Sequence, residues 1–287
     1  MNDSNKSMMK KICVITGATS GIGKETAKTL ALKGAYIIIV GRNTKKCVST
    51  VDTIKQETGN NNVDYIYTDL SDLKQVYNLV KVLKQNYPRI DVLVNNAGAY
   101  FRTRLESVDG YEMTLALNYL SPFLLTTLLI DMLKGSSQGR IINLSSGAHF
   151  NGSINIEDLQ SKDNFVGFNA YAQSKLALML FSYQLAERLK NTNITVNALD
   201  PGSVATNFGK NNGWLRFYIR RLIRRNEISP KEGSRTCIYL ATSSDVTDIT
   251  GGYFLKDKQV KSSDSSYDEK LAKKLWEVSE TLTNISF

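Results

Sequence analysis

The chain has 287 residues, of which 42% are apolar and 22% charged, a balance ordinary for a soluble globular protein with a large core. Its three cysteines are scattered and it has one histidine, His149, so a disulfide framework, a metal site and histidine-based triad chemistry are excluded from our expectations. The net charge of +9 is compatible with nucleic acid, but no nucleic-acid-binding module appears, and we expect no such partner. We interpret His149 as a loop residue, with substrate contact as the alternative.

The sequence predicts no targeting or membrane-spanning segment. The first residues, MNDSNKSMMKK, lack the apolar core of a secretory signal, because polar and charged residues lead directly into a strand-like segment. The longest apolar run, 119–133, contains Pro122 and Asp131 and is too short to span a bilayer, so we expect a buried helix there. Unpaired cysteines fit a reducing compartment, and we predict a cytoplasmic protein.

Strand-like and helix-like segments alternate along the chain. Continuous runs rich in Ile and Val, typical of strands covered on both faces, stand at 10–16, 35–41, 63–69, 90–96, 140–146 and 194–200. Helical stretches separate them, which predicts βαβ units with right-handed crossovers. We therefore expect an α/β protein: a single Rossmann-fold domain over residues 1–287, with a doubly wound, parallel, roughly seven-stranded sheet.

A glycine loop, TGATSGIG at 16–23, follows the first expected strand and opens the first helix. Glycines there permit a tight turn and let the backbone approach a pyrophosphate at the helix N-terminus. A plain βα turn is the alternative. The candidate cofactor-binding residues of this loop are Gly17, Thr19, Ser20, Gly21, Ile22 and Gly23.

The end of the second strand reads Val40-Gly41-Arg42-Asn43, without the carboxylate that would bind the adenine ribose hydroxyl of NAD. The next acidic residue is Asp52, inside the following helix. A guanidinium beside an acid-free turn suits a 2′-phosphate, so Arg42 favours NADP(H) as the cofactor. An arginine on a solvated turn is the bland alternative.

The third and fourth strands end in further cofactor candidates. Asp69 and Leu70 would flank the adenine, and Asn95-Asn96-Ala97-Gly98 brings two amides and a glycine to the same edge of the sheet. The amides could instead tie neighbouring strands together, while Gly98 leaves space for adenosine. We take Asn95, Ala97 and Gly98 as candidates.

AYAQSKLAL, residues 170–178, places a tyrosine and a lysine four positions apart on one face of an expected helix. Side chains snorkelling at the edge of the core are the alternative to chemistry. A phenol with a pKa of about 10 is a poor base near neutrality, but an ammonium one turn away favours the phenolate. Tyr171 and Lys175 are therefore a candidate acid–base pair.

Residues 203–228 depart from the βα rhythm and are expected to form a helical substrate lid. WLRFYIRRLIRR, residues 214–225, is amphipathic when placed on a helix. We interpret it as packing its apolar stripe over the substrate. Peripheral contact with anionic lipid is the alternative.

These motifs together make the chain resemble the short-chain dehydrogenase/reductase family over nearly its whole length. The matching segments are TGATSGIG, NNAG at 95–98, Asn118, Ser145-Ser146, Tyr171-x-x-x-Lys175 and PGSVAT at 201–206. HFNGSINIEDLQ, NAYAQSKLALMLFSYQLAERL and the LAKKLWEVSETL of an expected tail helix at about 268–283 resemble the retinol dehydrogenase-like branch. That branch lengthens the serine-to-tyrosine connection, which here spans 25 residues.

The resemblance implies a catalytic tetrad of Asn118, Ser146, Tyr171 and Lys175. Tyr171 would exchange a proton with the substrate oxygen that Ser146 holds, and Lys175 would also bind the nicotinamide ribose. Asn118, which interrupts a buried helix, would hold a water that links Lys175 to solvent.

The resemblance also implies further cofactor contacts and an assembly. The cofactor contacts are Tyr171, Lys175, Pro201, Gly202, Val204 and Thr206. The family's usual subunit contact, through helices starting near Asp109 and Ala170, implies a homodimer.

The function expected is an NADP(H)-dependent oxidoreductase that interconverts an apolar aldehyde or ketone and its alcohol by hydride transfer. A reductase of a cyclic polyketide- or porphyrin-like secondary metabolite is the alternative within the enzyme class. A non-catalytic NADP-binding scaffold is the alternative outside it, and the intact tetrad argues against that.

Overall fold

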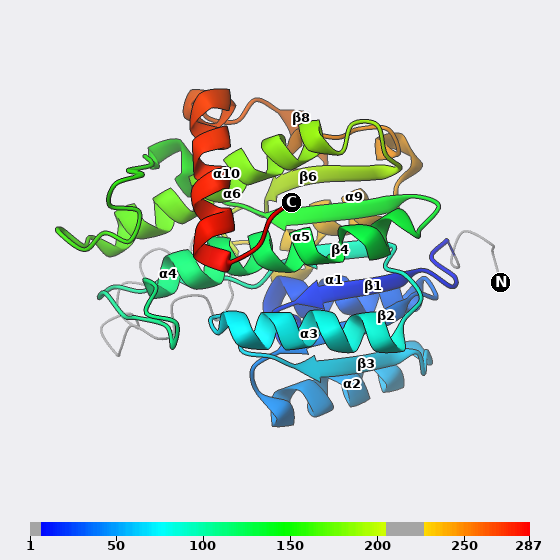
Figure 1. Ribbon diagram of the computed structural model, residues 1–287. Helices are drawn as coiled ribbons and strands as arrows, with labels where there is room; N and C mark the ends of the chain where they lie inside the picture. Colours follow the sequence, from blue (N-terminus) through cyan, green and yellow to red (C-terminus); the bar gives the residue numbers. More distant parts are fainter. Residues whose placement is uncertain (1–6, 205–226) are drawn as a thin grey trace.

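Eight strands form one sheet in the computed structural model, which describes residues 7–204 and 227–287 (Figure 1). The strands are β1 (Ile12–Thr16), β2 (Tyr36–Gly41), β3 (Val63–Tyr67), β4 (Val92–Asn95), β5 (Gly139–Leu144), β6 (Ile194–Asp200), β7 (Gly252–Leu255) and β8 (Lys258–Val260). Their order is β3-β2-β1-β4-β5-β6-β7-β8. Strands β1 to β7 pair in parallel, and β8 pairs antiparallel with β7. The predicted doubly wound parallel sheet is confirmed, with an antiparallel edge strand added.

Helices connect the strands and cover both faces of the sheet (Figure 1). The longer ones are α1 (Gly21–Leu32), α2 (Thr44–Thr58), α3 (Leu73–Asn86), α5 (Ser121–Lys134), α6 (Gly167–Arg188), α9 (Arg235–Thr242) and α10 (Glu269–Thr283). Shorter turns of helix are α4 (Met113–Leu115), η2 (Ala116–Leu120), η3 (Gly147–Asn151), α8 (Pro230–Gly233), η6 (Ser244–Val246) and η7 (Asp264–Tyr267). The tail helix expected at about 268–283 is α10.

The alternation of side chains along each strand builds two cores. Val14 of β1 belongs to the cluster with α3, α5, α6 and α10, whereas its neighbours Cys13 and Ile15 belong to the cluster with α1, α2 and α9. Both faces are therefore buried along β1, β2, β4, β5 and β6, which read as continuous apolar runs. The edge strand β3 differs, because Asp64, Tyr65 and Tyr67 are exposed.

The chain reverses its direction of travel across the sheet between β1 and β4. It proceeds from β1 outward to β3 and then returns to β4 on the other side of β1. The carboxyl ends of β1 and β4 consequently border the topological switch point, where open α/β sheets bind their ligands.

The C-terminal helix α10 packs against α6 and η2. The Trp276 ring lies 5.0 Å from that of Phe123 and 5.7 Å from that of Phe181, and the hydroxyls of Tyr119 and Ser279 are 2.7 Å apart. Part of the α5 and α6 surface on which the sequence placed a dimer contact is thus covered by this chain itself.

The apolar run at 119–133 lies in a helical stretch, Met113–Lys134, that is long and apolar enough to cross a membrane by length and composition. In the described structure 78% of its most apolar window is buried inside the protein. It packs as the buried helix expected from the sequence. The proposed lid lies almost entirely outside the described residues.

Candidate active site

The glycine loop links β1 to α1 at the switch point. Gly21, the first residue of α1, has a left-handed φ of +57°, and a Cβ on Gly23 would lie 2.5 Å from Asn96 Nδ2. Ser20 makes no side-chain capping bond and the first turn of α1 holds no acidic residue. The amides at this helix start can therefore receive an anion, and the loop fits a dinucleotide pyrophosphate.

The remaining loop candidates face neighbouring segments. Gly17 packs against Ala97, because an added Cβ would lie 2.9 Å from Ala97 Cα. Thr19 lies against Gly41 of β2, and Ile22 lies against Gly233 of α8. The loop is thus wedged between β2, β4 and α8.

Two residues that the sequence analysis did not select fix this loop to β4. Thr16 Oγ1 accepts the backbone N–H groups of Asn96 and Ala97 at 2.9 and 3.0 Å. Asn96 Nδ2 donates to Thr16 O at 2.7 Å. The second asparagine of NNAG was the available signal, since its amide is the group that spans the two strand ends.

Arg42 lies exposed immediately after β2. Asn43 is the N-cap of α2, and its side chain accepts from the Lys46 N–H at 2.9 Å. Lys45 and Lys46 are exposed on the first turn of α2. These cations beside the glycine loop make the turn electropositive, which suits a phosphate on the adenine ribose.

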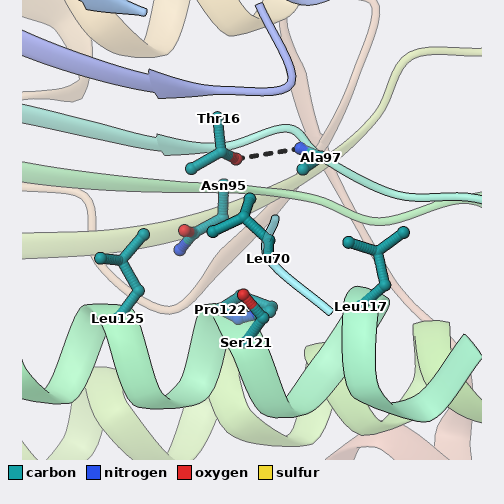
Figure 2. Close-up of a pocket in the computed structure, with 8 residues that line it drawn as sticks. All are labelled: Thr16, Leu70, Asn95, Ala97, Leu117, Ser121, Pro122 and Leu125. Carbon is teal, nitrogen blue, oxygen red and sulfur yellow. Dashed lines mark hydrogen bonds between the residues drawn. The ribbon is translucent and has the colours of Figure 1, made fainter. Parts of the chain in front are cut away.

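Figure 2 shows a pocket at the switch point, lined by Thr16, Leu70, Asn95, Ala97, Leu117, Ser121, Pro122 and Leu125. Leu70 and Ala97, two of the cofactor candidates, are among its lining residues. The Asn95 amide instead points toward α5, where Nδ2 donates to Thr126 Oγ1 and Asn143 Oδ1, each at 2.8 Å. Its side chain therefore ties β4 to β5 and α5, the structural alternative that the sequence left open.

Asp69 uses its carboxylate within its own turn. Its Oδ1 accepts from Ser71 N–H at 3.0 Å and from Ser71 Oγ at 2.7 Å. Its backbone N–H donates to Gln75 Oε1 at 2.9 Å. This network positions Leu70 at the pocket of Figure 2.

Ser146, Tyr171 and Lys175 gather at the carboxyl end of β5. Tyr171 and Ser146 form a side-chain hydrogen bond, and Lys175 Nζ lies 5.8 Å from the centre of the Tyr171 ring. Lys175 Nζ also donates to Leu144 O at 2.7 Å. The ring of Tyr100 meets Tyr171 edge-on, with 6.1 Å between centroids. Residues from well-separated parts of the sequence thus converge on one phenol.

Burial dominates the electrostatics of this cluster. Burial raises the pKa of Tyr171 to about 12, the hydrogen bond from Ser146 opposes this rise, and Asp200 adds to it. Among the protein's own groups, burial outweighs the opposing hydrogen bond. The lowered pKa expected for Tyr171 also relies on the positive charge of an oxidised nicotinamide, which acts only when the cofactor is bound. Burial also lowers the pKa of Lys175 to about 8, against the opposing effect of Asp200. The phenol is therefore held in its proton-donating form.

Asn118 lies in a π-helical turn, η2, between α4 and α5. Its Oδ1 accepts from Ala99 N–H at 2.9 Å, and its Nδ2 donates to Ala99 O at 2.9 Å and Ser174 Oγ at 3.1 Å. The expected helix irregularity is confirmed, and such bulges recur at functional sites. A Cβ on Gly98 would lie 3.3 Å from Asn118 Oδ1 and 3.6 Å from Lys175 Nζ. Gly98 therefore lies close to both side chains.

The segment after β6 approaches the glycine loop. Pro201 leads into Gly202, which has φ +79° and donates its N–H to Asp200 Oδ1 at 2.9 Å. Val204 forms a bridge with Ile228 and lies against Gly233. Thr206 lies outside the described residues.

His149 lies in the short turn η3 that follows β5, and its side chain is fully buried. Its Nδ1 is 2.7 Å from Ser146 O, and its Nε2 accepts from the Ser263 N–H at 3.1 Å. This pairing requires the neutral ring with the proton on Nδ1, which donates to Ser146 O. Burial lowers the pKa of His149, in agreement with that form. The ring joins the serine loop to the C-terminal segment.

Comparison with known proteins identifies the class. The family model described as short chain dehydrogenase matches residues 11–213. Human polyprenol dehydrogenase is 37% identical over 282 residues, covering 96% of this chain and 86% of the relative. Mouse retinol dehydrogenase 14 is 38% identical over 296 residues, covering 97% and 87%. The chain therefore belongs to the short-chain dehydrogenase/reductase family of oxidoreductases, in its retinol dehydrogenase-like branch.

Solved structures agree with this assignment. A protein from Mycobacterium paratuberculosis superposes with a TM-score of 0.81 at 30% identity, covering 100% of this chain and 98% of that one. The Pseudomonas aeruginosa RhlG/NADP complex superposes with a TM-score of 0.69 at 27% identity, covering 88% and 97%.

Proposed function

We propose that the protein is an NADP(H)-dependent oxidoreductase that interconverts an apolar aldehyde or ketone and its alcohol, with Tyr171 as the acid and base. The observation that carries the proposal is the convergence of Ser146, Tyr171 and Lys175 at the strand edge beside the glycine loop. A non-catalytic binding protein has no need of a buried phenol next to a buried ammonium.

The proposed mechanism assigns each group a task. When bound, NADP(H) supplies or accepts the hydride. During reduction Ser146 Oγ holds the carbonyl oxygen and Tyr171 Oη gives it a proton as negative charge develops. Lys175 binds the nicotinamide ribose hydroxyls, and its charge stabilises the phenolate left on Tyr171. Asn118 orients the water path through which Lys175 exchanges protons with solvent.

Binding of the cofactor is assigned to five segments. The start of α1 holds the pyrophosphate, and Arg42, supported by Lys45 and Lys46, holds the 2′-phosphate. Leu70 and Ala97 flank the adenosine, and the Pro201–Val204 segment borders the nicotinamide. An acid-free turn after β2 supports NADP(H) over NAD(H).

The substrate class rests on the names of relatives that act on retinol and polyprenol, both apolar alcohols. A cytoplasmic location and a homodimer, expected from the sequence, belong to the same proposal. Because α10 covers part of α5 and α6, a dimer through these helices would include α10 in its interface.

A panel of short and long-chain aldehydes tests the activity. We expect oxidation of NADPH, followed at its absorbance band, to outpace that of NADH and to increase with the apolar length of the aldehyde. Cofactor binding without turnover on any aldehyde, ketone or alcohol would favour the scaffold instead.

A further inference from the structure

Asp200 places a carboxylate next to the catalytic cluster. It is the last residue of β6 and pairs with Leu255 of β7, one position beyond the Leu144–Leu199 pair that joins β5 to β6. Lys175 Nζ donates to Leu144 O, so the ammonium and the carboxylate stand at the ends of adjacent strands. Asp200 Oδ2 lies 3.1 Å from the position of a Cβ on Gly147, directly after the catalytic serine.

The side chain of Asp200 also holds the turn that follows it. Its Oδ1 accepts from the Gly202 N–H at 2.9 Å, and Gly202 has a left-handed φ of +79°. One carboxylate therefore reaches both the serine loop after β5 and the turn assigned to the nicotinamide side of the cofactor.

The titratable groups that face this carboxylate come from three elements. They are Lys175 and Tyr171 of α6, His149 of η3 and Tyr253 of β7, and Asp200 raises the pKa of each of them. Within the described ranges, 7–204 and 227–287, no Lys or Arg nitrogen lies within 4.0 Å of its carboxylate. Its charge therefore acts on the cluster without an ion-pair partner among these residues.

We propose that Asp200 is a positioning residue that keeps Lys175 charged and Tyr171 protonated, and so sets the pH range in which this site donates a proton. The inference rests on the proposed function. Asp200 does not alter the equilibrium between carbonyl and alcohol, because that equilibrium depends only on the substrate and the cofactor. Asp200 determines how far toward alkaline pH Tyr171 stays protonated.

The physical reason is the conflict that burial creates at Lys175. Burial favours the neutral amine, which would remove the cation that binds ribose hydroxyls. A nearby carboxylate restores the ammonium. The same carboxylate disfavours the phenolate, which keeps Tyr171 ready for reduction and makes alcohol oxidation require a higher pH.

The test compares pH profiles of alcohol oxidation and aldehyde reduction for the natural protein, Asp200→Asn and Asp200→Glu. Asn keeps an oxygen that can accept the Gly202 N–H, while removing the charge. We expect the oxidation profile of Asp200→Asn to move toward acid by about one pH unit. Asp200→Glu, which retains the charge, is expected to keep the natural profile.

Two further measurements separate charge from structure. NADPH binding followed by fluorescence is expected to weaken at lower pH in Asp200→Asn than in the natural protein, because Lys175 loses its proton earlier. Asp131→Asn, which removes an exposed charge from α5, is the matched control and should leave both profiles unchanged. Asp200→Ser, whose hydroxyl can also accept from a nearby backbone N–H, provides a second neutral variant if Asn impairs folding.

An unchanged profile in folded Asp200→Asn and Asp200→Ser would overturn the inference, and so would an equal shift in Asp131→Asn. If the natural protein turns over substrate and the pH profiles of the neutral Asp200 variants match its own, this inference fails and the proposed function stands. Absence of turnover by the natural protein removes the proposed function as well.

Discussion

Gly23→Ala is expected to damage cofactor binding and stability together. The new methyl group would lie 2.5 Å from Asn96 Nδ2, 2.9 Å from Ala18 Cα and 2.9 Å from Gly17 O. Two of these three atoms belong to the backbone of the glycine loop, which leaves Asn96 as the group that must move. Its displacement stretches the 2.7 Å bond to Thr16 O and with it the junction between β1 and β4.

Overpacking of this kind costs roughly 1–3 kcal/mol. In a chain of this size each kcal/mol lowers the melting temperature by about 2–4 °C. Because the loop must keep its amides aimed at the pyrophosphate, we expect the dissociation constant for NADPH to rise about tenfold or more, equivalent to about 1.4 kcal/mol. Calorimetry without ligand and fluorescence titration with NADPH measure the two effects.

Gly135→Ala serves as the control. Gly135 ends α5 with an ordinary φ of −69°, and a Cβ there would lie 3.3 Å from its nearest atom, Met132 O. We expect a change within about 0.5 kcal/mol and unchanged NADPH binding. A Gly23→Ala protein that melts and binds NADPH like the natural one would refute the account of this loop.

Three other predictions concern the cofactor, pH and assembly. We expect the natural protein to bind NADPH at least about tenfold more tightly than NADH. Arg42→Asp should reverse this preference, because it replaces a phosphate partner with a repelling charge. Equal affinities for the two cofactors in the natural protein would contradict this. Stability should fall as the pH falls below about 6.5, because the unfolded chain takes up a proton at His149 that burial denies to the folded chain. Urea unfolding of His149→Gln should show a smaller loss between pH 7.5 and 5.5, and an identical loss would count against the buried neutral ring. Light scattering should give the mass of a dimer at micromolar concentration, and a purely monomeric mass would instead indicate that α10 closes the α5 and α6 surface.

Local signals in the sequence were sufficient for the first six strands and the glycine loop. The Ile and Val runs predicted β1, β2, β4, β5 and β6 because burial on both faces leaves no polar alternation in these strands. Gly21 and Gly23 were found because a left-handed turn and a close approach each demand glycine. The hairpin between β7 and β8 gave no such signal. Its turn residues, Lys256 and Asp257, both adopt positive φ without glycine or asparagine.

Properties that depend on packing between distant segments could not be predicted. His149 pairs with Ser263, 114 residues further along the chain, and nothing local to either residue indicates that contact. The raised pKa of Tyr171 follows from burial by surrounding elements, whereas the sequence shows only the favourable lysine one turn away. Asp200 reads as an ordinary strand-end residue until the register of β5 and β6 brings its carboxylate against Gly147, directly after Ser146.

The central claim, that Tyr171 transfers the proton, is tested most directly by Tyr171→Phe. Phenylalanine keeps the ring that packs against Tyr100 and removes only the hydroxyl that bonds to Ser146. The account predicts that NADPH binding survives while turnover of an apolar aldehyde falls by roughly two to four orders of magnitude. Retention of more than about a tenth of the activity would contradict it and assign the proton to another group.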